Sequence, residues 1–155
     1  LEDLLRGCSS EGFAAASAYA ACRVAGVART IEEITKVAKA TSAEQRAAYT
    51  ALNRELGLPI GPIDPAQYLP RFASELELPS DIERRAREYV SMITAQGIGA
   101  GRNPSGVAAA CLYTAARDIE FGLTQQTAAE IADVTPVTLR ATYHDLREMT
   151  PSTME

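Results

Sequence analysis

The chain has 155 residues, enough for one large domain or two small ones, and its 15 basic and 20 acidic side chains give a formal net charge of −5. It contains no apolar, uncharged run of about 18 residues or more, which argues against a membrane span, and its charged opening "LEDLLRG" lacks the apolar core of a secretory signal. Lys36 and Lys39 are the only lysines, a usage that suits high intracellular salt or, alternatively, a GC-rich genome.

Helical periodicity extends along the whole chain and no strand pattern is present, so we expect an all-α fold. The predicted helices, in chain order, cover residues 9–25, 30–39, 43–56, 66–76, 80–96, 104–120, 124–133 and 136–149. The helices over 9–25 and 104–120 are alanine-rich and apolar on almost every side. Each is therefore expected to be the buried central helix of its own helical unit.

The stretch "GLPIGPIDP" (57–65) is rich in proline and glycine, and no helix can cross it. Two helices are predicted after it. The first has Tyr68, Phe72 and Leu76 in helical period, and the second follows Pro79 with Ser80 as its expected N-cap. The inward stripe of the second helix consists of Ile82, Ala86, Tyr89 and Ile93.

The chain contains an internal duplication at a fixed offset of 94 residues. Residues 12–52 align without a gap on residues 106–146, and 14 of the 41 positions are identical. The matched pairs include Tyr19/Tyr113, Arg23/Arg117, Thr30/Thr124, Thr41/Thr135, Arg46/Arg140, Tyr49/Tyr143 and Leu52/Leu146. Alanine bias cannot align tyrosine, arginine and threonine in one register, so we infer two copies of one helical unit.

The two copies differ in the number of helices expected before the central one. The second copy has five predicted helices, whereas the first has three and opens on residues 1–7, which look like the tail of a further helix. We therefore expect the sequence to be part of a longer protein. Without its two upstream helices, the first copy should leave the sides of the helix over 9–25 exposed.

The segment "IADVTPVTLRATYHDL" (131–146) has the spacing of a helix-turn-helix. Thr135 can cap the last helix, and Pro136 suits its first position, where a missing N–H costs nothing. The expected buried stripe is Leu139, Tyr143 and Leu146, and the expected outward residues are Val137, Thr138, Arg140, Ala141 and His144. In such a motif the second helix presents its first residues to base edges in the major groove.

No residue pattern supports a metal site, a cofactor site or catalysis. The three cysteines, Cys8, Cys22 and Cys111, are too far apart for a zinc pattern, and the single histidine, His144, cannot complete one. Cys22 and Cys111 lie in alanine-rich helices and are expected to be small buried residues in a reducing compartment. Carboxylates occur singly, and no nucleophile has a plausible second partner. We expect no metal, no cofactor and no enzymatic activity.

Four motifs in order carry a family resemblance: "GFAAASAYAACRVAGVARTIEEITKVA", "IDPAQYLPRFASELELP", "GRNPSGVAAACLYTAAR" and "VTPVTLRATYHDL". With them the chain resembles the core of archaeal transcription initiation factor B, the counterpart of eukaryotic general transcription factor IIB. The resemblance implies two cyclin-like helical repeats, the first truncated to about three helices and the second with five that end in the helix-turn-helix. The corresponding boundaries are 1–58 for the first repeat, 59–65 for the linker and 66–155 for the second repeat.

The resemblance also implies a function and partners. The repeats would bind the complex of TATA-box-binding protein with promoter double-stranded DNA, and the second repeat would read the element upstream of the TATA box. The family's zinc ribbon and its segment that enters RNA polymerase have no counterpart here, so polymerase would be contacted through parts missing from this sequence. A cytoplasmic, nucleoid-associated protein without membrane contact is implied.

The predicted DNA contacts lie in three places. On the last helix, Arg140 can pair with guanine, Val137 with a thymine methyl, Thr138 with a base or phosphate, and His144 with the backbone. At "GRNPSG", Arg102 and Ser105 would add donors to a helix start that attracts phosphate. At the start of the preceding helix, the expected backbone contacts are Thr124, Gln125 and Gln126. The alternatives are plain capping at both helix starts and a surface ion pair for Arg140.

Comparison of the copies predicts that the first repeat does not read DNA. It has Ala43 and Glu44 where the second has Val137 and Thr138, and a carboxylate at the helix tip repels phosphate. The preceding helix carries both lysines in place of two acidic residues. The expected contacts with TATA-box-binding protein are Arg23, Lys36, Lys39 and Arg46; the alternative for Lys36 is a pair with Glu32 on a solvated helix.

Cyclin-like repeats also serve as protein-docking modules, so a module that regulates a partner enzyme without DNA contact is the alternative function. The chemistry of the last helix favours the DNA-binding function.

Overall fold

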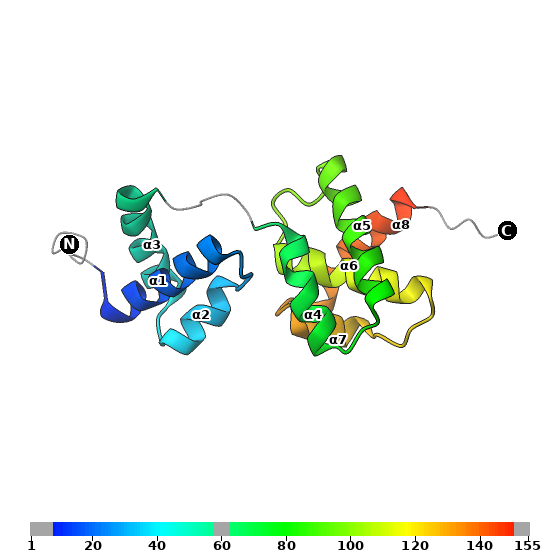
Figure 1. Cartoon of the computed structure of the whole chain (residues 1–155), viewed down its shortest axis with the longest axis horizontal. Coiled ribbons are helices and arrows are strands. Elements are labelled where there is room, and N and C mark those ends of the chain that lie inside the picture. Colours follow the sequence, from blue (N-terminus) through cyan, green and yellow to red (C-terminus); the bar gives the residue numbers. More distant parts are fainter. Residues whose placement is uncertain (1–7, 58–62, 151–155) are drawn as a thin grey trace. The chain divides into compact units, whose positions relative to one another are not determined.

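The computed structural model describes residues 8–57 and 63–150, and every regular element within those ranges is helical, which confirms the all-α prediction (Figure 1). The chain divides into two compact units, Leu1–Pro62 and Ile63–Glu155. The helix tail predicted at 1–7 and most of the predicted connector lie outside the described residues. No helix in the described ranges is long and apolar enough to cross a bilayer.

The described part of the first unit contains three helices: α1 (Ser10–Ala25), α2 (Ile31–Ala38) and α3 (Ser42–Leu56). Both α2 and α3 pack against α1. Each helix begins after a hydroxyl residue whose side chain accepts a hydrogen bond from the backbone two or three residues inside the helix. These N-caps are Ser9, Thr30 and Thr41, so the predicted helix starts are confirmed to within one residue.

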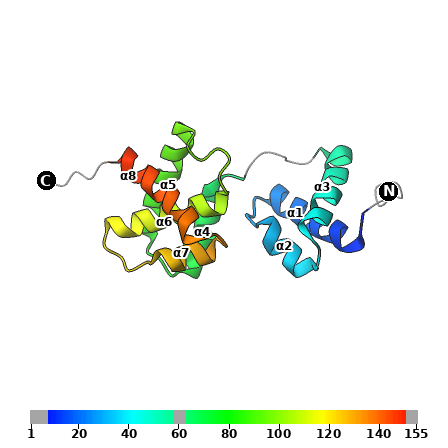
Figure 2. The same ribbon diagram turned by 180° about the vertical axis from the view of Figure 1, so that it is seen from behind.

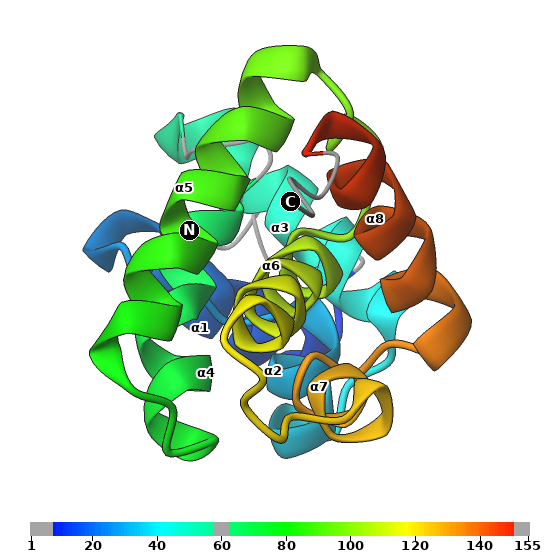
Figure 3. The same ribbon diagram turned by 90° about the vertical axis from the view of Figure 1, so that its right-hand side faces the viewer.

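The second unit surrounds a central helix, α6 (Pro104–Asp118), in which every residue from 105 to 116 is buried. Around it pack a 3₁₀ turn η1 (Pro65–Tyr68) and four helices, α4 (Leu69–Glu75), α5 (Ser80–Gln96), α7 (Gln125–Ile131) and α8 (Pro136–Met149). Figure 3 looks along α6 and shows α4, α5, α7 and α8 arranged about it. The prediction of a buried central helix is confirmed for this unit.

In the second unit, the predicted start of one helix, the predicted cap of another and the predicted end of the central helix are wrong. The helix expected over 66–76 begins as the 3₁₀ turn, because Pro70 has no N–H to donate to the carbonyl of Ala66. Ser80 is not an N-cap: Pro79 occupies the cap position with an extended ψ of 151° and no side-chain cap bond, and the helix starts at Ser80 itself. Helix α6 ends at Asp118 rather than at residue 120, because Glu120 takes a left-handed φ of 55°.

Helix α1 is buried on one side only, so the expectation of a buried central helix is wrong for the first unit, whereas the prediction that the sides of this helix are exposed is confirmed. Ala14, Ala18 and Ala21 share one face of α1 and are exposed, as expected if upstream helices are needed to cover it. Their counterparts in α6 are buried, because η1, α4 and α5 also pack on that helix. The described part of the first unit contains no equivalents of those three elements.

The duplication predicted from the sequence extends to side-chain geometry. Tyr19 packs edge-on against Tyr49 with ring centroids 5.2 Å apart and an interplanar angle of 74°. Tyr113 packs against Tyr143 at the same distance and 69°. In each unit an arginine one turn further along the central helix lies 6.0 Å above the first ring of the pair. The two units are thus built on one packing scheme.

One buried position departs from this scheme. Gln45 in α3 is fully buried where the second unit has the fully buried Leu139. Neither atom of the Gln45 amide group has a hydrogen-bond partner among the described residues. A buried amide that lacks partners costs about 1–3 kcal/mol. The first unit therefore contains a destabilising side chain that its duplicate avoids.

Replacing Gln45 with leucine is expected to stabilise the first unit by about 1–2 kcal/mol, because the unpaired amide is removed and the replacement is the residue that fits the duplicate. Native-state hydrogen exchange of the α1 and α3 amides should slow by about 5–30-fold. The same change at Gln67, which is exposed in η1, is the control and should leave exchange unchanged. Unaltered exchange in Gln45→Leu would show that the amide is satisfied in solution.

Candidate nucleic-acid interface

Helix α8 presents the outward face that the sequence predicts. Thr135 caps the helix by accepting a hydrogen bond from the Thr138 N–H, and Pro136 is its first residue. The buried side contains Leu139 and Leu146, with Tyr143 half-buried. The residues expected to face outward are all exposed: Val137, Thr138, Arg140, Ala141 and His144. Val137 is 69% exposed, a high value for a large apolar side chain in the first turn of a helix.

Helix α7 precedes α8 across a turn at residues 132–135, and the two helices form a helix-turn-helix (Figure 2). The turn is possible because Asp133 adopts a left-handed φ of 55°. Val134 then packs close to Gly106 of α6, where an added Cβ would lie 3.3 Å from a Val134 methyl carbon. The small residue at the start of α6 thus lets the turn sit close against the central helix.

Ser105 does not have the predicted role of a phosphate contact. Its side chain is fully buried, with the hydroxyl oxygen 3.0 Å from the carbonyl oxygen of Ala132 and 2.8 Å from Asn103 Oδ1. Asn103, not Ser105, caps α6. The prediction for Ser105 was wrong because the sequence could not reveal that the end of α7 covers the start of α6. Ser105 instead ties the helix-turn-helix to the central helix.

Arg102 is half-buried and already engaged. Its guanidinium forms an ion pair with Asp145 of α8 at 2.5 Å and donates to the Thr142 hydroxyl at 3.1 Å. Both partners lie on α8, so Arg102 holds α8 against the start of α6. A phosphate contact would have to share this guanidinium with a carboxylate, which weakens the predicted role.

The three residues predicted at the start of α7 have different surroundings. Thr124 caps α7 by accepting from the Thr127 N–H at 3.1 Å. Gln126 is exposed and donates to Glu130 one turn along the same helix at 2.8 Å. Gln125 is half-buried, and its amide contacts two other helices, α6 and α8. The capping alternative therefore holds for Thr124 alone.

Arg140 has one protein partner among the described residues, and it is not a carboxylate. Its Nε donates to Oε1 of Gln125 at 3.3 Å. The surface ion pair considered as an alternative is not formed in the described structure. The positive charge of Arg140 therefore remains available on the exposed face of α8.

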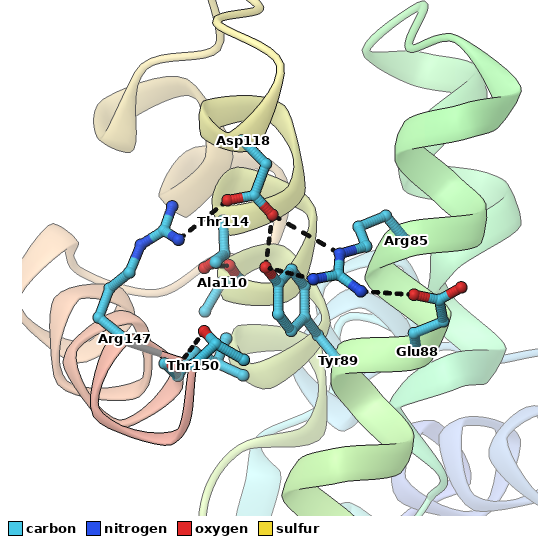
Figure 4. Close-up of polar contacts among 9 residues, drawn as sticks. Arg85, Glu88, Tyr89, Ala110, Thr114, Asp118, Arg147 and Thr150 are labelled. Atoms are coloured by element: carbon cyan, nitrogen blue, oxygen red, sulfur yellow. Dashed lines mark hydrogen bonds and ion pairs between the residues drawn. The ribbon is translucent and has the colours of Figure 1, made fainter. Parts of the chain in front are cut away.

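A polar cluster that the sequence did not reveal fixes the other end of α8 (Figure 4). Asp118, at the end of α6, accepts hydrogen bonds from Tyr89 of α5 and from Arg147 of α8, the latter at 2.9 Å. Arg85 completes the cluster, with its guanidinium carbon 4.5 Å from the centre of the Tyr89 ring. Burial, and then the hydrogen bond to Asp118, raise the pKa of Tyr89. The described part of the first unit contains no such cluster, since the counterpart of Asp118 there is the exposed Val24.

The first unit places its predicted partner contacts on the surface. Lys36, Lys39 and Arg46 are exposed, whereas Arg23 is half-buried and donates to the Tyr19 hydroxyl at 3.3 Å. No ion pair joins Glu32 and Lys36 in the described structure, so the lysine is not neutralised by the neighbour that the alternative proposed.

The tip of α3 has the character predicted for it. Ala43 is exposed, and the Glu44 carboxylate accepts a hydrogen bond from the Ser9 hydroxyl at 2.6 Å. This glutamate is therefore part of the junction between α1 and α3, and it places a negative charge where the second unit has an uncharged threonine.

The cysteines predicted to be buried differ in how far they are buried. Cys111 is fully buried in α6, and burial raises the pKa of its thiol. Cys22 is only half-buried, which corrects the prediction of full burial; its face of α1 is less covered than the corresponding face of α6. Among the described residues, no cluster of three or more histidine, cysteine or carboxylate side chains could hold a metal ion.

The sequence is similar to those of known proteins. The family model described as "Transcription factor TFIIB repeat" matches residues 1–55 and 60–149. Transcription initiation factor IIB 1 of Halobacterium salinarum is 59% identical over 145 residues, which cover 94% of this chain and 50% of the relative. Transcription initiation factor IIB 3 of the same organism is 46% identical over 144 residues, covering 93% and 45%. Transcription initiation factor IIB of Methanococcus maripaludis is 43% identical over 145 residues, covering 94% and 43%.

The chain spans about half the length of the curated relatives that it matches. Two of those named come from a halophile, in agreement with the acidic, lysine-poor composition. The family match covers almost the whole chain and includes both helical units. The chain therefore belongs to the transcription initiation factor IIB family.

Proposed function

We propose that this chain binds a complex of TATA-box-binding protein with promoter DNA and reads the bases upstream of the TATA box with α8. The observation that carries the proposal is the first turn of α8, where the exposed Val137 lies beside an Arg140 that no carboxylate neutralises. An exposed valine has no packing role there, but it can contact a thymine methyl. The arginine can form a bidentate pair with guanine.

The net charge of the chain is compatible with this role. Residues 1–60 carry 7 basic and 7 acidic side chains, and residues 61–155 carry 8 and 13, but none of the five outward residues of α8 is acidic. In about 1 M salt the Debye length is near 3 Å, so distant charges contribute little and direct contacts decide binding. Affinity then comes from the assembly of two proteins on DNA rather than from general neutralisation of phosphates.

The partner surface proposed for TATA-box-binding protein lies on the first unit. Lys36 and Lys39 are exposed on α2 and at its C-cap, and Val37 between them is 84% exposed. A basic and apolar surface of this kind suits an acidic protein surface with an apolar centre. Arg46 and Arg23 extend the basic character of the unit. The proposal places the chain on promoter DNA in an archaeal cytoplasm.

Replacing Arg140 with alanine is expected to weaken the ternary complex on a duplex that contains the upstream element by about 10–100-fold, the value of one bidentate arginine–guanine pair. A gel-shift titration with and without TATA-box-binding protein measures this. The chain alone should bind the duplex negligibly, with a shallow dependence on salt. Arg84→Ala is the matched control, because Arg84 is an exposed arginine of the same unit that is paired with Asp81.

The experiment separates the two candidate functions. If the chain is a protein-docking module without DNA contact, Arg140→Ala and Arg84→Ala will behave alike. Tight binding of the chain alone to duplex DNA, with steep salt dependence, would contradict the proposal that affinity comes from the assembly.

A further inference from the structure

We infer that Gln125 is a positioning residue that orients Arg140 for bidentate recognition of guanine, rather than a phosphate contact. The inference rests on the proposed function of α8. It assigns to the helix-turn-helix a residue that determines sequence specificity without touching a base.

The first step is the direction of the hydrogen bonds at Gln125. Its Oε1 accepts from Arg140 Nε at 3.3 Å, and its Nε2 donates to the Tyr113 hydroxyl at 3.3 Å. Both ends of the amide therefore have protein partners on different helices. An amide that is held at both ends has a fixed orientation, and its oxygen stays directed at the arginine.

The second step is the rigidity of the group behind Gln125. Tyr113 is buried in α6, and its ring packs edge-on against Tyr143 of α8. Its hydroxyl also lies 3.5 Å from the Arg117 guanidinium. Gln125 thus connects the exposed Arg140 to the packed centre of the unit, and the loss of freedom on DNA binding is reduced accordingly.

The third step is what the bond leaves free on Arg140. A guanidinium can offer a pair of donors either from Nε with one Nη or from the two Nη atoms. Because Nε is bonded to Gln125, the two Nη atoms of the exposed Arg140 remain as the available pair of donors. Guanine presents O6 and N7 as two adjacent acceptors in the major groove, which matches such a pair.

The duplicate provides an internal comparison. The first unit has the same tyrosine pair and has Arg46 at the position of Arg140, but Ile31 replaces Gln125. Isoleucine cannot accept a hydrogen bond. No side-chain hydrogen bond or ion pair holds Arg46 in the described part of the chain. The orienting amide therefore occurs in the unit proposed to read bases and is missing from the unit that is not.

The test measures sequence preference separately from affinity. The probe is a duplex library with randomised positions directly upstream of a TATA box, bound by the 155-residue chain together with TATA-box-binding protein. Selection identifies the preferred duplex, and a scrambled upstream element serves as the reference. The ratio of the two affinities is then measured for Gln125→Met, Arg140→Ala and the double variant, with Gln67→Met as the matched control because Gln67 is exposed in η1 and is not among the predicted DNA contacts.

We expect Gln125→Met to lower the ratio by about 3–10-fold while leaving affinity for the scrambled duplex unchanged. Arg140→Ala should remove the preference at the same base position, and the double variant should be no worse than Arg140→Ala. Gln125→Glu keeps an acceptor for Nε, so it should retain the ratio although its charge lowers affinity for both duplexes. Gln67→Met should behave like the unmodified chain.

Two results would overturn the inference while leaving the proposed function intact. If Gln125→Met weakens preferred and scrambled duplexes equally, Gln125 contacts phosphate directly. If it changes neither, the amide has no role in recognition. If Arg140→Ala itself leaves the ratio unchanged, the proposed function of α8 fails, and the inference fails with it.

Discussion

Replacing Leu139 with glutamine is expected to destabilise the second unit by about 3–5 kcal/mol. Leu139 is fully buried where α8 packs against the central helix. The substitution removes a buried apolar side chain and places an amide in a site built around leucine, where no group is positioned to hydrogen-bond with it. Each change lowers the free energy of unfolding. The unfolding transition should shift to lower urea concentration, followed by circular dichroism and by exchange of the α6 and α8 amides.

The control for this prediction is Leu139→Met, which conserves volume and polarity and should cost less than about 1.5 kcal/mol. The first unit makes the comparison sharp, because it already has a glutamine at the equivalent position, Gln45. If Leu139→Gln proves harmless, the duplicated fold accommodates an amide at this site. In that case the stabilisation expected from Gln45→Leu should also be missing.

Most helix starts could be predicted because they depend on local chemistry. The side chain of a capping threonine bonds to a backbone N–H only three residues away, and Thr135 caps its helix as predicted. Thr30 and Thr41 cap their helices in the same way. The duplication added independent support, since each copy constrains the other. The errors at Pro70 and Ser80 have a local cause as well, and the missing N–H of Pro70 could have been weighed from the sequence.

The parts of the site that could not be predicted depend on contacts between distant segments. Ser105 belongs to a helix start that looks suited to phosphate, and only the approach of Ala132 from α7 buries its hydroxyl. Asp118 joins three helices through partners 29 residues away on either side. The periodicity of residues within one helix does not indicate which residues of other helices it will contact. The alignment of the two copies did contain one usable signal, since it places the polar Gln45 opposite Leu139.

The two units have the same packing scheme but different helix tips. In the first unit the Glu44 carboxylate is held by Ser9, and the tip helps to join two helices. In the second unit the Thr138 side chain has one hydrogen-bond partner among the described residues, the cap residue Thr135, so its outer surface is free for another molecule. The duplication therefore allows a direct test of what the first turn of α8 does: the glutamate at position 44 of the first unit can be placed at position 138 of the second.

Thr138→Glu is expected to reduce the affinity of the ternary complex by ~100-fold or more, because a carboxylate facing the phosphates across an interface costs several kcal/mol. The fold should not suffer. Residue 138 is the third residue of α8, and a glutamate there beside the cap Thr135 completes a capping box, as Glu33 does with Thr30 in α2. Thermal unfolding should be unchanged or slightly raised, while the gel-shift titration with TATA-box-binding protein should show the loss.

Thr138→Gln separates charge from size, since glutamine has nearly the shape of glutamate but cannot repel phosphate. This control should keep affinity within about threefold of the unmodified chain, a difference below 1 kcal/mol. If glutamate and glutamine weaken the complex equally, the effect is steric and the charge argument is wrong. If neither weakens it, the first turn of α8 does not enter the duplex. The prediction that the first unit does not read bases would then lose its argument from Glu44.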